Sequence, residues 1–187
     1  MELGSWCANG RPRDRPRLAA PYPREIEMEF LGQFHPQIVH FPVALIVAGA
    51  IFELIGRATR LEWWRKAAFA LLVFGVLGAG AAVLSGREAA EVAADRHGVP
   101  EQPIEAHEEL AQLSLWIGVA AVLARALAGR AGAARRFLSV LALVLQLGVA
   151  VLVGVAGHRG GKLVFEYGAA VRVHGQPVMS GPAHEAD

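Results

Sequence analysis

Four stretches of the chain contain no Asp, Glu, Lys or Arg: residues 30–52, 67–86, 110–124 and 137–157. A helix needs about 20 mostly apolar residues to cross a bilayer, so the first, second and fourth stretches are long enough. The third is shorter, and it spans only if Glu109 and Arg125 at its ends reach the interfaces or face other helices. The pattern predicts an all-α protein: a four-helix transmembrane bundle with a short extracytoplasmic C-terminal segment.

The composition agrees with this prediction. Of the 187 residues, 54% are hydrophobic, and the mean hydropathy of +0.37 is high for a water-soluble domain of this length. The lipid bilayer is therefore the first expected partner. The net charge is only +1, and the basic residues are scattered among loops instead of forming one patch, so we expect no nucleic-acid partner.

The charges of the loops predict an orientation. The loop from Arg87 to Glu109 has two basic and seven acidic residues, whereas the other two loops are rich in basic residues. Loops rich in Arg and Lys stay in the cytoplasm, so both termini are expected to be extracytoplasmic. We interpret Arg57, Arg60, Arg135 and Arg136 as residues that set the orientation and not the activity. The basic residues of the two inner loops are Arg57, Arg60, Arg65, Lys66, Arg125, Arg130, Arg135 and Arg136.

The ends of the chain differ in composition from its middle. Residues 1–27 hold five arginines and the single cysteine, Cys7, and have no apolar run long enough for a signal peptide. We expect this segment to be disordered, or spurious with translation beginning at Met28. Residues 28–173 are then the four-span membrane domain, and residues 174–187 are a disordered tail.

The first span opens with His-Pro-Gln-Ile-Val-His-Phe-Pro, residues 35–42. Proline suits the first turn of a helix and pushes the residue before it out of helical geometry, so Pro36 predicts a cap or loop position for His35. Pro42 cannot donate to the carbonyl of Ile38, which predicts a kink there. The two histidines are five residues apart, about 140° around a helix, so a straight helix cannot aim both at one ligand.

Small residues occur in the second and third spans at spacings that let helices approach closely. We expect helix contacts at Gly75, Gly78, Ala79, Ala82 and Gly86, and at Ala111, Ser114, Gly118 and Ala121. The serines Ser85, Ser114 and Ser139 are interpreted as packing residues, because none lies in a nucleophile motif with a base beside it. We therefore do not expect an enzyme.

Three motifs together resemble a known family. They are the opening octet, the Glu105-Ala106-His107-Glu108-Glu109 entry to the third span, and the closing Gly160-Gly161-Lys162-Leu163-Val164 with Gly168 and Val171. They look like a family of small bacterial four-span membrane proteins known only as a domain of unknown function, and the resemblance covers about residues 31–173. It implies a bacterial inner-membrane location.

The resemblance also implies a cofactor class. The family is similar in plan to the membrane b-type cytochromes, and some related proteins are joined to cytochrome c modules, which implies redox work. A histidine is common in the family where this chain has Tyr167, so we expect no ligand at that position.

Four histidines from three spans are expected at similar depth on the outer side: His35, His40, His107 and His158. The first hypothesis is a haem b site for electron transfer with a membrane or periplasmic redox partner, in which His40 and His107 are the iron ligands and His158 is the reserve ligand. His35 is a further cofactor-binding candidate, but its removal is expected to have much less effect. The second hypothesis is a zinc, iron or copper site, and the third is a non-catalytic subunit of a larger membrane complex. The structural alternative is that these histidines cap helices and bond to carbonyls that Pro36 and Pro42 leave free.

Overall fold

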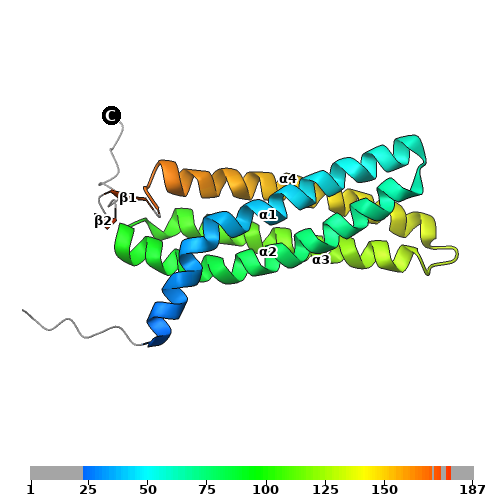
Figure 1. Cartoon of the computed structure of the whole chain (residues 1–187). Coiled ribbons are helices and arrows are strands. Elements are labelled where there is room, and N and C mark those ends of the chain that lie inside the picture. Colours follow the sequence, from blue (N-terminus) through cyan, green and yellow to red (C-terminus); the bar gives the residue numbers. More distant parts are fainter. Residues whose placement is uncertain (1–22, 170, 174–175, 178–187) are drawn as a thin grey trace, which may run out of the picture.

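The computed structural model describes residues 23–169, 171–173 and 176–177. Figure 1 shows four long helices: α1 (Pro23–Thr59), α2 (Glu62–His97), α3 (Glu101–Ala128) and α4 (Arg135–Phe165). Strand β1 (Arg172–Val173) pairs antiparallel with β2 (Gln176–Pro177). The predicted all-α four-helix bundle is confirmed.

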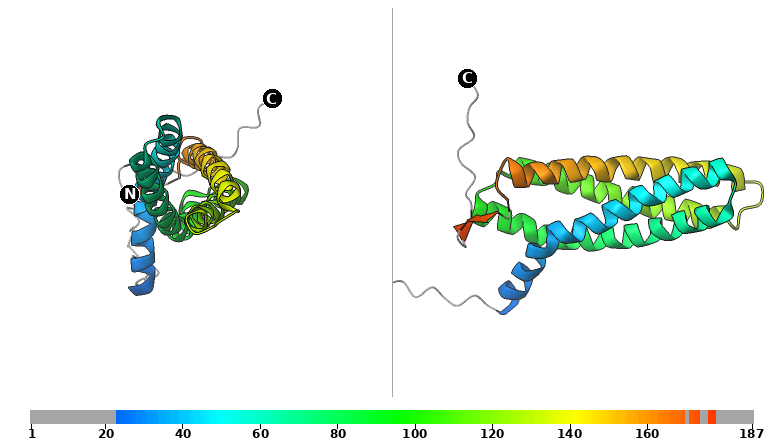
Figure 2. Two further views of the ribbon diagram at one scale, coloured as in Figure 1. Left: turned by 90° about the vertical axis from the view of Figure 1, so that its right-hand side faces the viewer. Right: turned by 45° about the horizontal axis from the view of Figure 1, so that its top comes forward.

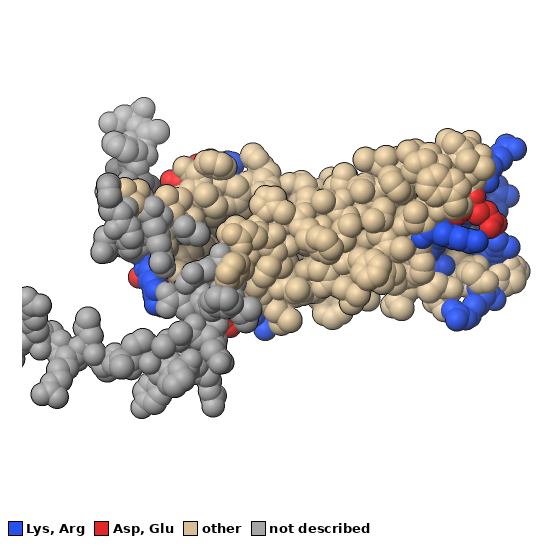
Figure 3. All heavy atoms as spheres, viewed as in Figure 1, with Lys and Arg blue, Asp and Glu red and all other residues tan. Residues whose placement is uncertain are grey.

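The helices run up and down with short connections. α1 packs mainly on α2 and α3 mainly on α4, so the bundle consists of two helical hairpins, and α1 and α3 lie diagonally across it (Figure 2). All four helices are long and apolar enough to cross a membrane. The face in Figure 3 agrees: charged side chains gather at the two ends, and the broad middle has none.

The core contains small residues where helices touch, as the spacing predicted. Ile46, Leu72, Ala121 and Val149 are at most 1% exposed and form its centre. A Cβ atom on Gly75 of α2 would lie 2.7 Å from Cγ1 of Ile46 in α1. Contacts below 3.0 Å force neighbouring atoms to move, so this glycine sets how closely the two helices approach.

Gly75→Ala is therefore expected to lower the free energy of unfolding by about 1–3 kcal/mol, the usual cost of overpacking a core. A titration with a denaturing detergent, followed by circular dichroism, measures the change. Gly80→Ala is the matched control, because a Cβ atom there meets nothing within 4 Å. An equal loss in both variants would contradict the packing argument.

The start of α1 differs from the prediction. The helix begins at Pro23, so Pro36 lies in its interior and His35 is helical; the cap or loop position was wrong. A bilayer favours an unbroken helix, because the backbone groups of a loop would lack partners, and a helix with proline bends instead. Figure 1 shows this bend in the first half of α1, which holds Pro36 and Pro42. Residues 23–27 of the predicted disordered segment are helical, and residues 1–22 lie outside the described residues.

The other end of the chain covers the mouth of the bundle. Helix α4 continues past His158 to Phe165, and the chain then turns at Gly168, which has a φ of 69°. Ala169 is buried against Val99 and Ile104, between α2 and α3. Of the predicted tail, residues 176–177 form β2, and residues 174–175 and 178–187 lie outside the described residues.

Candidate functional site: a histidine pair across the bundle

Two histidines meet across the diagonal of the bundle. His35 of α1 and His107 of α3 have ring centroids 6.4 Å apart, with 80° between the ring planes, and both side chains are half-buried. We call them the histidine pair. An ionisable residue inside a spanning bundle is costly to bury and usually has a function.

Both rings are held through Nδ1. The Nδ1 atom of His107 lies 3.0 Å from the carbonyl oxygen of Ala156 on α4, and a carbonyl only accepts, so Nδ1 carries the proton. His35 Nδ1 lies 3.0 Å from Oγ of Ser85 on α2. Ser85 donates its own proton to the carbonyl of Ala82, so its oxygen accepts from His35. With the proton on Nδ1, the free lone pair of each imidazole lies on Nε2. A histidine that binds a metal through Nε2 has this tautomer.

Two glycines face the rings. A Cβ atom on Gly86 of α2 would lie 3.1 Å from Cε1 of His35, and one on Gly160 of α4 would lie 3.0 Å from Cε1 of His107. Both distances are tighter than ordinary van der Waals contact. The rings of His35 and His107 therefore lie where a side chain at position 86 or 160 would otherwise be, and glycine at each position leaves room for the ring.

The other two candidate histidines lie elsewhere. His40 is exposed, and its Nδ1 atom bonds to the carbonyl oxygen of Pro36 on its own helix. His158 is exposed on α4, where the next residue, Arg159, donates to the carbonyl of Ala106. The structure thus brings His107 together with His35 and not with His40, the partner that the sequence analysis chose.

Residues seven positions apart in α1 form two series, one on the face that points into the bundle and one on the exposed face. Residues seven apart lie on the same face of a helix, because seven residues make about two turns. One series faces inward and is buried or half-buried: His35, Pro42, Gly49 and Gly56. The other is exposed: His40, Val47 and Leu54. The row of small residues in the first series was the signal for the inward face.

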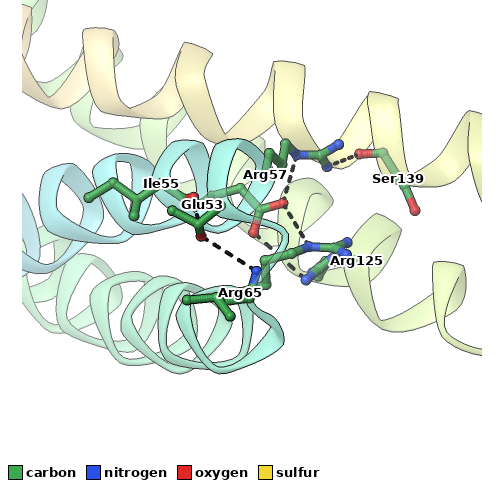
Figure 4. A network of polar contacts seen from close by, with 8 residues as sticks. Glu53, Ile55, Arg57, Arg65, Arg125 and Ser139 are labelled. Carbon is green, nitrogen blue, oxygen red and sulfur yellow. Dashed lines mark hydrogen bonds and ion pairs between the residues drawn. The ribbon is translucent and has the colours of Figure 1, made fainter.

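A second polar cluster lies at the opposite end of the bundle, and sequence reasoning did not find it (Figure 4). Glu53 of α1 has a side chain only 2% exposed, and its Oε1 accepts a hydrogen bond of 2.9 Å from Nε of Arg57. Arg65 of α2 and Arg125 of α3 lie 3.8 and 3.7 Å from the same carboxylate. Arg57 also donates to the carbonyl of Ser139 on α4 at 2.8 Å. We call Glu53, Arg57, Arg65 and Arg125 the Glu53 cluster; with Ser139 it joins all four helices.

The described residues contain no group of side chains for the zinc, iron or copper site of the second hypothesis. Within the part of the chain that the structure describes, no three His, Cys, Asp or Glu side chains lie together so that they could hold a metal ion. In the histidine pair, one imidazole of α1 and one of α3 lie close together.

The bundle of four apolar helices defines the class: a multi-pass membrane protein. The chain belongs to the family described as predicted membrane protein DUF2231, which matches residues 33–173. The resemblance seen in the sequence is thereby confirmed. No curated protein and no solved structure matches the chain.

Proposed function

We propose that the protein binds haem b between His35 and His107 and transfers electrons through it. The observation that carries this proposal is the distance between the two rings. Two imidazoles that hold one metal ion between them would have ring centroids about 6 Å apart, because each metal–nitrogen bond would be about 2 Å long and the nitrogen lies about 1 Å from the ring centre. The centroids of the histidine pair are 6.4 Å apart.

Three further features fit a haem iron with two imidazole ligands. The Nδ1 hydrogen bonds to Ser85 and Ala156 fix the tautomer and leave Nε2 for a metal. The ring planes are 80° apart, so the rings do not stack face to face, an arrangement that would point neither Nε2 atom to a site between them. Haem sites of membrane bundles are built from facing helices, as α1 and α3 are here.

The roles of the protein groups follow from this placement. Bound haem supplies the exchange of one electron at its iron. His35 and His107 would hold it, and Ser85 and the Ala156 carbonyl would keep the imidazoles oriented and raise their basicity. The apolar residues of the bundle would limit the access of water, which tunes the reduction potential.

A visible spectrum tests the proposal. The full chain is expressed in cells well supplied with haem, purified in mild detergent and reduced with dithionite. We expect the strong visible bands of a reduced b-type haem, at close to one haem per chain. A colourless protein under these conditions would overturn the proposal.

Gly160→Ala tests the space around His107. Its added Cβ atom would lie 3.0 Å from Cε1 of that histidine, so the ring must move, and we expect a shifted haem spectrum or a lower haem content. Gly161→Ala is the control, because a Cβ atom on the next glycine meets nothing within 4 Å. Identical spectra of the two variants and the wild type would argue against haem at His107.

The proposal includes an orientation in the bacterial inner membrane. Lys and Arg gather at the right-hand end in Figure 3, which holds the connections α1–α2 and α3–α4, and basic loops stay in the cytoplasm. Both termini and the histidine pair would then be extracytoplasmic, within reach of a membrane or periplasmic redox partner.

Reporter fusions measure this orientation. Alkaline phosphatase fused after Asp187 is expected to be active, because it folds outside the cytoplasm, and a fusion in the α3–α4 connection is expected to be inactive. The reverse pattern would refute the orientation.

A further inference from the structure

We propose that the three arginines of the Glu53 cluster bind the phosphate group of an anionic lipid. This site lies at the end of the bundle opposite the histidine pair, and it does not depend on haem binding.

The cluster carries an excess of positive charge. Three guanidinium groups, those of Arg57, Arg65 and Arg125, surround the single carboxylate of Glu53, which leaves a formal charge of +2. The carboxylate is 2% exposed, and the arginine side chains are 17–32% exposed. Like charges held this close repel one another, and a bound anion would offset the repulsion.

Most guanidinium N–H groups of the cluster have no hydrogen-bond acceptor among the described residues of the protein. Each guanidinium has five N–H donors. Among the described residues, Arg57 makes the hydrogen bonds of the cluster, to Glu53 and to the carbonyl of Ser139. Arg65 and Arg125 lie 3.8 and 3.7 Å from the carboxylate, too far for a hydrogen bond. Arg65 Nε is one of three buried side-chain polar atoms among the described residues that have no hydrogen-bond partner, and it is a donor that a phosphate oxygen could accept from.

The tryptophans beside the cluster indicate that it lies near the membrane interface. Trp63 and Trp64 stack on each other at the start of α2, directly before Arg65, and tryptophan prefers the membrane interface. Phosphate accepts paired hydrogen bonds from guanidinium, and basic sites between membrane helices suit anionic headgroups. Because each arginine side chain is partly exposed, a phosphodiester at the surface can reach the cluster without unfolding a helix.

Native mass spectrometry of the full chain in detergent measures lipid binding. We expect phosphatidylglycerol to remain bound where phosphatidylcholine does not. Arg65→Gln and Arg125→Gln are each expected to weaken phosphatidylglycerol binding roughly tenfold, the usual effect of losing hydrogen bonds to a charged group. Arg130→Gln is the matched control, because it removes the same charge from an exposed arginine near this end of the bundle. Equal weakening in all three variants, or no weakening in any, would overturn the site.

Thermal unfolding of the wild type gives a second measurement that needs no variant. A ligand that binds only the folded state raises the melting temperature by an amount that grows with the logarithm of its concentration above Kd, so phosphatidylglycerol should raise it and phosphatidylcholine should not. A parallel titration with inorganic phosphate distinguishes the source. Stabilisation by inorganic phosphate alone would assign the cluster to free phosphate, and stabilisation by neither would overturn the proposal.

Discussion

His35→Ala and His107→Ala are each expected to abolish most of the visible absorbance of the purified protein. Removal of either imidazole would leave the iron with a single strong protein ligand, and the bound haem would be lost or change its spectrum. The measurement is the reduced-minus-oxidised spectrum together with the ratio of haem to protein. Far-ultraviolet circular dichroism of each variant shows whether the bundle still folds.

His40→Ala and His158→Ala are the matched controls for this pair of variants. His40 lies on α1, as His35 does, and His158 lies on α4 near the end of the bundle that holds the pair; both side chains are exposed, and His40 bonds to Pro36 of its own helix. We expect wild-type spectra. Loss of the spectrum in His40→Ala, with His35→Ala unaffected, would restore the pairing chosen from the sequence.

Glu53→Gln is expected to lower the free energy of unfolding by about 3 kcal/mol. The amide leaves Arg57, Arg65 and Arg125 without a counter-charge, and breaking a buried ion pair costs about 3–5 kcal/mol. We expect the lower limit because the arginine side chains are partly exposed and water screens them. A titration with a denaturing detergent, followed by circular dichroism, measures the difference from the wild type.

Glu62→Gln controls for the loss of a negative charge in this region. Glu62 pairs with Lys66 on the same helix, and both side chains are 80% exposed, so we expect a change within about 0.5 kcal/mol. If both variants were equally stable, the Glu53 cluster would have no structural role.

The number and the limits of the spans were predictable from the sequence because the bilayer imposes them. Inside a bilayer the backbone N–H and C=O groups must bond to each other, which long apolar stretches achieve by forming helices. The apolar stretches therefore give the positions of the helices to within a few turns. Even the shortest stretch, residues 110–124, lies within a full spanning helix, Glu101–Ala128. Glu109 is exposed near the beginning of this helix, and Arg125 near its end reaches inward to Glu53.

The choice between His35 and His40 failed for a physical reason. The sequence established that only one of two histidines 140° apart could face a given ligand. The decision then rested on Pro36 as the start of the helix, although in lipid the helix continues through it and keeps the phase set by Pro42, Gly49 and Gly56. Ser85 was interpreted as a packing residue. Its hydrogen bond with His35 joins two helices, and the spacing of residues in the sequence does not reveal such a contact.

The Glu53 cluster was missed because Glu53 directly follows the charge-free stretch of residues 30–52, and nothing in the sequence distinguishes it from an ordinary charged residue at the end of a span. Its depth became visible only when three other helices supplied contacts to it and to Arg57. Arg57 had been interpreted as a residue for orientation alone, and its bonds to Glu53 and Ser139 give it a structural role as well.

The two helical hairpins meet along a middle made mostly of apolar residues, and hydrogen bonds, ion pairs and a ring contact join them near both ends. Apolar helix faces with many small residues do little to fix the relative position of two helices along their axes, because similar contacts between methyl groups form again after a shift. The His35–His107 contact at one end and the bonds of Glu53 and Arg57 at the other do not have this tolerance. A slip of one hairpin past the other by a single turn, about 5.4 Å, would break both sets together. The contacts at the two ends of the bundle therefore fix the position of one hairpin along the axis of the other.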